Sequence, residues 1–221
     1  MEFLNEEGKS KYQTMIGSFQ WIISIGRFDI QVHVMTLLSF RAMPCRGHLE
    51  RAKRIYCYIA KMKRAAIRIR TDMPDLTDLP KLTYDWSTSV YGELKEVLPD
   101  NTPPPLGKAV TTITYKDANL MHDVLSGHSV TGIVHYMNQT PVDWYTKKQG
   151  TVETATYGSE FNAARTAVEQ IIDLRTTLRY FGVPVLDHSY MFGDNQSVVT
   201  SSTIPQSCLN KRHTILSYHK V

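Results

Sequence analysis

Three acidic residues stand where they could bind a metal ion together. Asp117 closes a β-like run of threonine, isoleucine and tyrosine residues, and Asp194 closes a second apolar run. Glu160 lies in the first turn of a helix that we expect to begin near residue 155. Two strand ends and the first turn of a helix can meet at one edge of a sheet. Because unpaired carboxylates are costly when they cluster, the pattern predicts a divalent-metal site, which is the apparatus for cleaving a phosphodiester.

Each acid also has an ordinary structural explanation. An aspartate after a strand is a common turn residue, which would account for Asp117 and Asp194 separately. Glu160 alone could be a first-turn acid that interacts favourably with the helix dipole. The order of the three acids, each at the end of a strand or the start of a helix, is what favours a shared metal site.

The elements that must position these acids follow from the hydrophobic period. Past residue 108 the pattern predicts three strands, a long helix, a fourth strand and two further helices: 111–117, 129–137, 142–147, 155–181, 189–193, 195–202 and 209–219. A turn at 138–141 joins the second and third strands. We therefore expect an α/β fold with a mixed sheet of three antiparallel strands and a parallel strand added by a helical crossover.

The first third of the chain carries three apolar stripes at helical spacing, so we predict a small helical region over residues 1–70, with a possible short strand at 65–70. Residues 71–108 hold most of the prolines and are predicted to be an acidic, proline-rich linker. Residues 109–221 form the predicted α/β domain.

Charge is unevenly distributed in this chain of 221 residues with a net charge of +4. Residues 41–70 contain ten Lys or Arg and one acid, whereas residues 72–100 contain seven acids and two lysines. Such asymmetry indicates a polyanion partner for the basic segment, although a solvated helix face would look the same.

Cysteine usage and the amino-terminal sequence bear on the compartment. Cys45, Cys57 and Cys208 are odd in number and form no CxxC pair, which favours reduced thiols over a disulfide scaffold or zinc site. The polar first ten residues do not resemble a signal peptide, and no apolar run is long enough to span a bilayer. We expect an intracellular protein with no membrane partner, in either the cytoplasm or the nucleus.

Several sequence blocks, taken in order, carry a family resemblance. They are Asp117-Ala118-Asn119-Leu120-Met121-His122-Asp123, Ser129-Val130-Thr131-Gly132, Asp143-Trp144-Tyr145-Thr146-Lys147-Lys148-Gln149, Glu153-Thr154-Ala155-Thr156-Tyr157-Gly158-Ser159-Glu160-Phe161 and Asp194-Asn195-Gln196-Ser197. Together they resemble the ribonuclease H domain of copia-type LTR retrotransposon polyproteins. The segment 12–62 resembles the helical end of the reverse transcriptase that precedes this domain.

The resemblance implies a fold, a reaction and a role for each matching residue. It implies a ribonuclease H-like sheet in which Asp117, Glu160 and Asp194 are catalytic and hold two Mg²⁺ (or Mn²⁺) ions that cleave the RNA strand of an RNA–DNA hybrid. The residues expected to contact nucleic acid are Asn119, Lys147, Lys148, Gln149, Asn195 and Arg212, with His213 and His219 as auxiliary candidates. The remaining partners would be the palm and fingers of the reverse transcriptase in the parent polyprotein.

The sequence also departs from the family pattern. The family has a fourth acid after a further strand, and the sequence reaches Val221 before either, so we expect a domain without its C-terminal strand and helix and with impaired metal binding. There is no Tyr-x-Asp-Asp motif, so polymerisation is not expected. Two alternatives stay open: a non-catalytic, nucleic-acid-binding remnant, and an integrase-type strand transferase, against which the Asp-Glu-Asp order argues. A purely structural protein would give the acids no reason to converge.

Overall fold

The computed structural model describes residues 2–79, 85 and 96–204, and the chain divides into two compact units, Met1–Arg68 and Ile69–Val221. The predicted helix at 209–219, together with Cys208, lies outside the described residues. None of the described helices has the length and apolar content that a membrane span requires. Of the described cysteines, Cys45 is buried, Cys57 is exposed, and both are free thiols.

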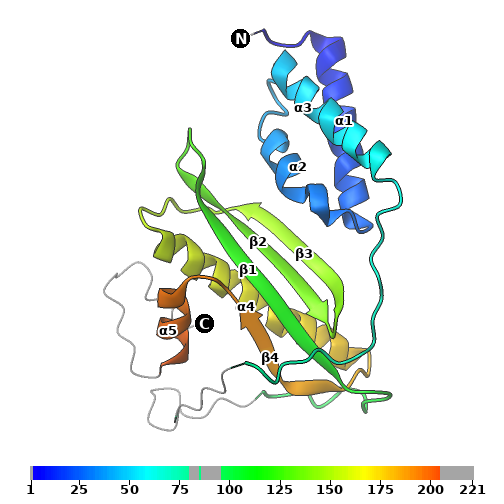
Figure 1. Cartoon of the computed structure of the whole chain (residues 1–221), viewed down its shortest axis with the longest axis vertical. Coiled ribbons are helices and arrows are strands. Elements are labelled where there is room, and N and C mark those ends of the chain that lie inside the picture. The colour runs from blue at the N-terminus through cyan, green and yellow to red at the C-terminus, as the bar shows by residue number, and fades with distance from the viewer. Residues whose placement is uncertain (1, 80–84, 86–95, 205–221) are drawn as a thin grey trace. The chain divides into compact units, whose positions relative to one another are not determined.

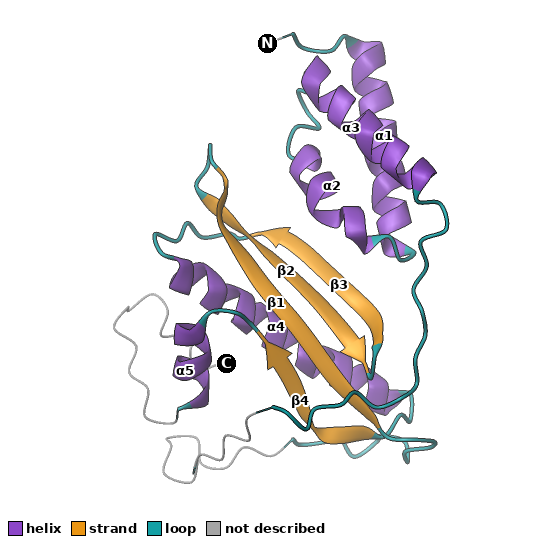
Figure 2. Cartoon of the chain, in the orientation of Figure 1, coloured by secondary structure: helices purple, strands orange, loops and turns teal. Residues whose placement is uncertain are grey.

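The first unit is helical, as predicted. Its elements are α1 (Glu6–Ser24), the short 3-10 helix η1 (Phe28–Ile30), α2 (Gln31–Leu38) and α3 (Arg46–Lys61), drawn as purple ribbons in Figure 2. Tyr12 and Phe19 of α1 pack with Val34 and Leu37 of α2 in its core, and the Tyr12 hydroxyl donates a 2.6 Å hydrogen bond to the carbonyl of Leu37. Residues 65–70 have no regular secondary structure, so the short strand predicted there was wrong.

The second unit is a mixed four-stranded sheet with two helices. The order along the chain is β1 (Val110–Asp123), β2 (His128–Met137), β3 (Thr140–Lys148), α4 (Thr156–Tyr180), β4 (Val185–Phe192) and α5 (Gln196–Thr203). Across the sheet the order is β3-β2-β1-β4, with β1 and β4 parallel and the other pairs antiparallel. The predicted mixed sheet, with α4 as the crossover into the parallel strand, is confirmed.

Helix α4 covers one face of the sheet and lies behind it in Figure 1. Strand β1 alternates accordingly: Thr112, Thr114 and Lys116 are buried toward α4, while Tyr115 and Asp117 point to the opposite side and are exposed. The interface between α4 and the sheet includes polar contacts: the buried His135 of β2 forms one hydrogen bond with Thr114 of β1 and another with Gln170 of α4. This alternation decides which side chains of β1 can meet residues of α4.

The amino-terminal part of α4 packs by means of an apolar cluster. Phe161 and Ala164 of α4 are buried together with Val198 of α5, and Tyr157 and Met191 pack against them. Glu160 is adjacent to Phe161 in sequence, so the cluster also fixes Glu160 in a buried position beside the sheet. Gly182 has a φ of 71°, a left-handed conformation that favours glycine, and it follows the end of α4 as predicted.

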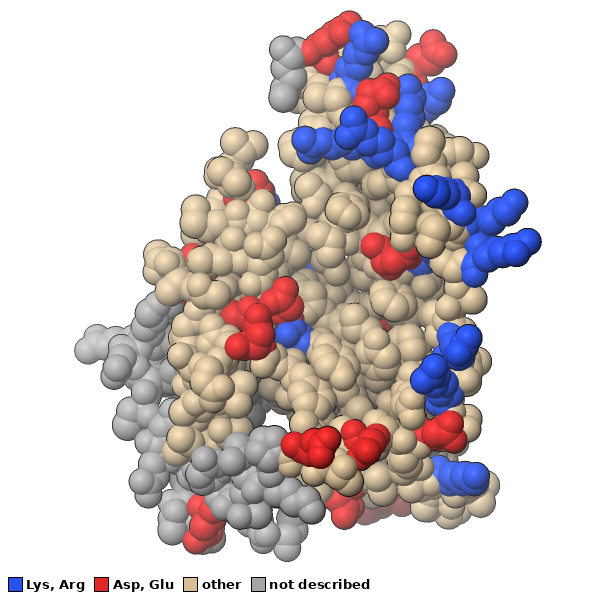
Figure 3. Space-filling model, viewed as in Figure 1, with Lys and Arg blue, Asp and Glu red and all other residues tan. Residues whose placement is uncertain are grey.

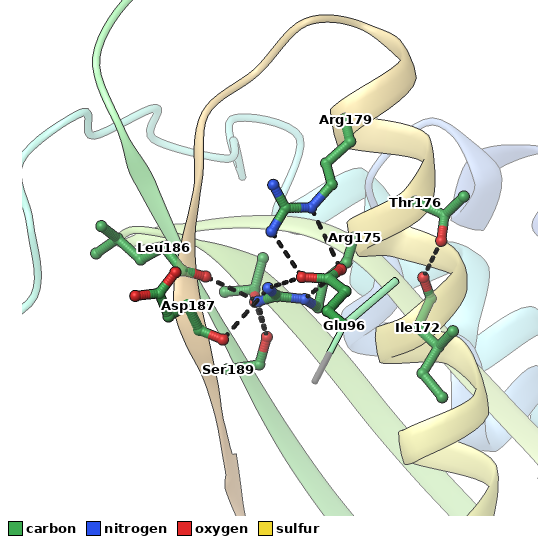
Figure 4. A network of polar contacts seen from close by, with 9 residues as sticks. Glu96, Ile172, Arg175, Thr176, Arg179, Leu186, Asp187 and Ser189 are labelled. Carbon is green, nitrogen blue, oxygen red and sulfur yellow. Dashed lines mark hydrogen bonds and ion pairs between the residues drawn. The ribbon is translucent and has the colours of Figure 1, made fainter. Parts of the chain in front are cut away.

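The carboxyl-terminal part of α4 is held to β4 by arginines, as Figure 4 shows. The Arg175 guanidinium donates to the carbonyls of Leu186 and Asp187 and to the Ser189 hydroxyl, and it pairs with Glu96 at 2.6 Å. Glu96 also pairs with Arg179 at 2.6 Å, and these bonds lower the pKa of Glu96 to about 2. The network fixes the helix that carries Glu160 and the strand that leads to Asp194.

The segment predicted to be a linker makes hydrogen bonds to the sheet unit. The Asn138 side chain donates to the carbonyl of Thr71, and just before the segment the amide of Arg70 donates to the Thr140 hydroxyl at 2.8 Å. Farther along, the amide of Leu106 donates to the carbonyl of Gly182 at 2.7 Å. The compact sheet unit accordingly begins at Ile69, whereas the sequence analysis placed the start of its domain at 109.

Candidate metal centre

The structure brings the three candidate acids together. Asp117 on β1, Glu160 on α4 and Asp194 after β4 each offer a carboxylate oxygen, and these oxygens all lie within 4.8 Å of one another. Figure 3 shows acidic side chains gathered where the segment after β4 passes β1, on the sheet face that α4 leaves uncovered. A separation of this size suits oxygens that share one or two hard cations.

The three acids differ in exposure. Glu160 is 2% exposed, whereas Asp117 and Asp194 are exposed to solvent. Strand β1 continues past Asp117 to Asp123, so Asp117 lies within the strand and pairs with Gly132 of β2, not at a strand end as predicted. An acid inside a paired strand is held more rigidly than one in a turn, which suits a ligand position.

Asp194 is positioned by the start of α5. The side-chain oxygen of Asn195 accepts a 3.1 Å hydrogen bond from the amide of Val198 and so caps the helix. Val198 is 1% exposed and belongs to the apolar cluster around Phe161. The same packing that fixes Glu160 on α4 therefore also fixes the turn that carries Asp194.

A buried lysine lies beside the acids. The Lys116 ammonium is 2.7 Å from Oε2 of Glu160, and the two side chains are 2% and 3% exposed. The other carboxylate oxygen, Oε1, accepts a 3.1 Å hydrogen bond from the amide of Ala118. Burial raises the pKa of Glu160, and the bonds to Lys116 and Ala118 oppose that effect.

Lys116 was missed as a site residue by the sequence analysis. The available signal was its alternation: it follows Thr112 and Thr114 on the face of β1 that turns toward α4. A lysine in a strand is ordinarily read as exposed, because lysine is almost never fully buried unless it is paired. Its partner Glu160 lies on another element, so local sequence gave no indication of the pair.

The residues predicted to contact nucleic acid differ in their exposure and in their hydrogen-bond and ion-pair partners. Lys147 on β3 is exposed. Asn119 is on the same face of β1 as Asp117, and its amide nitrogen lies 2.9 Å from Nδ1 of His122. Lys148 pairs at 2.9 Å with Asp123, whose pKa is lowered by bonds from Ser126 and from this lysine.

Two further predicted contact residues have structural partners. Gln149 is 8% exposed, and its amide nitrogen donates to the Thr131 hydroxyl and to the carbonyl of Ser159, which joins β2 to the start of α4. Its position inside the protein lends no support to a contact with nucleic acid. The oxygen of Asn195 caps α5, and Arg212, His213 and His219 lie outside the described residues.

The chain is similar in sequence to known proteins. It is 24% identical over 213 residues to the retrovirus-related Pol polyprotein from transposon RE1 of Arabidopsis thaliana, a match that spans 95% of this chain and 12% of that protein. The chain is similar to part of a retrotransposon polyprotein. The resemblance found in the sequence blocks is thereby supported at the level of a retroelement Pol polyprotein.

A second relative is matched over nearly its whole length. The secreted RxLR effector protein 161 of Plasmopara viticola is 25% identical over 168 residues, which is 76% of this chain and 94% of that protein. No family model matches the sequence, and no solved structure matches the fold.

Proposed function

We propose that the chain contains a ribonuclease H-like domain that binds Mg²⁺ or Mn²⁺ and cleaves the RNA strand of an RNA–DNA hybrid. The observation that carries the proposal is the convergence of Asp117, Glu160 and Asp194, whose oxygens lie within 4.8 Å although they come from three separate elements. The similarity to a retroelement Pol polyprotein supports the same assignment. Convergence is informative because a turn aspartate or a first-turn glutamate has no reason to meet two other acids.

The donor set fits a hard divalent cation. All three ligands are carboxylate oxygens, and two of them, on Asp117 and Asp194, face solvent, where a phosphodiester can approach. Glu160 lies beneath them with its orientation fixed by the Ala118 amide. A divalent ion held there would supply an activated water and neutralise charge on the leaving oxygen.

The hybrid would be recognised by its backbone and not by its bases. Asn119 shares the face of β1 that carries Asp117, and Lys147 is exposed on β3 of the same sheet. Amide and ammonium groups at such positions can contact phosphates and 2′-hydroxyls without reading base sequence. This recognition mode is what a hybrid-specific nuclease requires.

One observation favours a second function, the binding of nucleic acid without cleavage. Lys116 already pairs with one oxygen of Glu160, which leaves the cluster partly neutralised by the chain itself. In the helical unit, α3 carries exposed basic side chains, among them Arg51, Lys53 and Arg54. A polyanion could bind to that surface regardless of what the acids do.

The deciding experiment is a cleavage assay on a hybrid labelled on its RNA strand, with Mg²⁺ or with EDTA. Asp194→Asn is the test variant, and Asp187→Asn is its matched control, because Asp187 is an exposed acid on β4 outside the cluster. The proposal predicts metal-dependent loss of RNA that Asp194→Asn abolishes and Asp187→Asn retains. Equal cleavage by both variants would refute the assignment, whereas hybrid binding by folded protein with intact RNA would favour the second function.

A further inference from the structure

We propose that Lys116 is a built-in cation of the acid cluster and that it restricts the site to one divalent metal ion. This inference rests on the proposed metal site and concerns how many ions the site holds. Its basis is the ion pair with Glu160, in which the nitrogen and oxygen are 2.7 Å apart and both side chains are almost completely buried. An ammonium so placed repels a divalent ion at the same oxygen.

Glu160 has little free capacity for a metal in this arrangement. Oε2 accepts from the Lys116 ammonium and Oε1 accepts from the Ala118 amide, so each oxygen already has a donor from the chain. Each oxygen has a second lone pair, through which one ion shared with Asp117 and Asp194 can still bind. A second ion at Oε2 would have to share that oxygen with the Lys116 ammonium.

The fold makes room for this lysine. A Cβ added at Gly193 would overlap the end of the Lys116 side chain and would lie 2.7 Å from its nitrogen. Gly193 immediately precedes Asp194, so the ammonium lies against the backbone that leads into the third acid. The missing side chain at 193 therefore allows the positive charge to lie between β1, α4 and the segment after β4.

Charge balance favours a single ion while Lys116 is present. The three carboxylates and the Lys116 ammonium carry a formal charge of −2, which one divalent ion brings to zero and two would bring to +2. Excess charge beside a buried group is strongly unfavourable because the surroundings have a low dielectric constant.

The test is the stoichiometry of Mn²⁺ binding to the full chain, measured by calorimetry and by the electron paramagnetic resonance signal of free Mn²⁺. We expect one site-bound ion on the wild type, two on Lys116→Met, and one on the control Lys108→Met, which removes an exposed lysine of the same unit. Asp194→Asn, measured in parallel, identifies the ions that belong to the cluster.

Two results would overturn the inference: two cluster ions on the wild-type chain, or an unchanged number on a folded Lys116→Met variant. The first can be read even if the variant does not fold. Failure of the proposed function looks different. If the wild type binds no Mn²⁺ that depends on Asp194, the metal site itself is wrong, whereas absence of RNA cleavage with one bound ion leaves the role of Lys116 intact.

Discussion

The buried pair of Lys116 and Glu160 predicts a large and specific loss of stability. In Lys116→Met the Glu160 carboxylate keeps only the Ala118 amide as a donor while remaining 2% exposed. Leaving one partner of a buried ion pair uncompensated costs about 3–5 kcal/mol. We therefore expect the free energy of unfolding of the sheet unit to fall by about that amount in metal-free buffer.

The double variant Lys116→Met/Glu160→Leu separates the ion pair from simple packing. Replacing both partners with apolar side chains of similar volume is often nearly neutral, so the double variant should regain most of the loss of the single one. The coupling free energy from this cycle should be about 2 kcal/mol or more, which is within the range for residues in direct contact.

Urea unfolding in EDTA measures these differences. Tryptophan fluorescence can report on the sheet unit if Trp21 and Trp86 are replaced by Phe, since Trp144 then remains on β3. A loss of less than about 1 kcal/mol for Lys116→Met, the range of an exposed surface pair, would refute the burial on which the reasoning depends.

Three further predictions concern the same unit. Gly193→Ala should displace the Lys116 ammonium and lower the free energy of unfolding by about 1–3 kcal/mol, as overpacking does; unfolding curves equal to the wild type would contradict the close approach. Glu96→Gln should cost about 1 kcal/mol at neutral pH, a value reduced because the carboxylate is 37% exposed. Since the folded pKa of Glu96 is lowered from 4.5 to about 2, that difference should be present above pH 4.5 and disappear as the pH falls toward 2, while Asp100→Asn serves as an exposed control. Mg²⁺ at about 100 times its dissociation constant should stabilise the wild type by about 2.7 kcal/mol, and Asp194→Asn should lose most of this gain in a thermal melt.

The sequence predicted the sheet well because strand periodicity is a local property. The change to a period of two after residue 108 and the long apolar stripe of α4 were enough to give the elements and the mixed sheet. The extension of β1 to Asp123 was missed because asparagine and aspartate are depleted in strands, whereas here Asn119 and Asp123 pair with residues of β2.

The proline-rich segment shows the opposite limitation. Its composition predicts a free linker, yet its ends form hydrogen bonds with Asn138 and Gly182 of the sheet unit, and Glu96 joins Arg175 and Arg179. Composition reports what a segment could do alone. The donors and acceptors that hold it lie about 70 or more residues away in the sequence, so no local pattern could reveal them.

The positions of the three acids and the charge of their cluster differ in how well the sequence predicts them. Glu160 and Asp194 could be predicted as neighbours because one lies near the start of a helix and the other follows a strand, whereas Asp117 lies within β1 and not at its end, and Glu160 is in the second turn of α4 and not in the first. The electrostatic character of the cluster depends on Lys116, which is adjacent to Asp117 in sequence but points to the opposite side of β1 and meets Glu160 from beneath. Similarity to a Pol polyprotein is compatible with either an active or an inactive site, since a single residue of β1 changes the charge that the acids present to a metal. The number of ions bound, and not the presence of the three acids, is therefore the property that distinguishes a two-ion site from a one-ion site that the chain itself has partly neutralised.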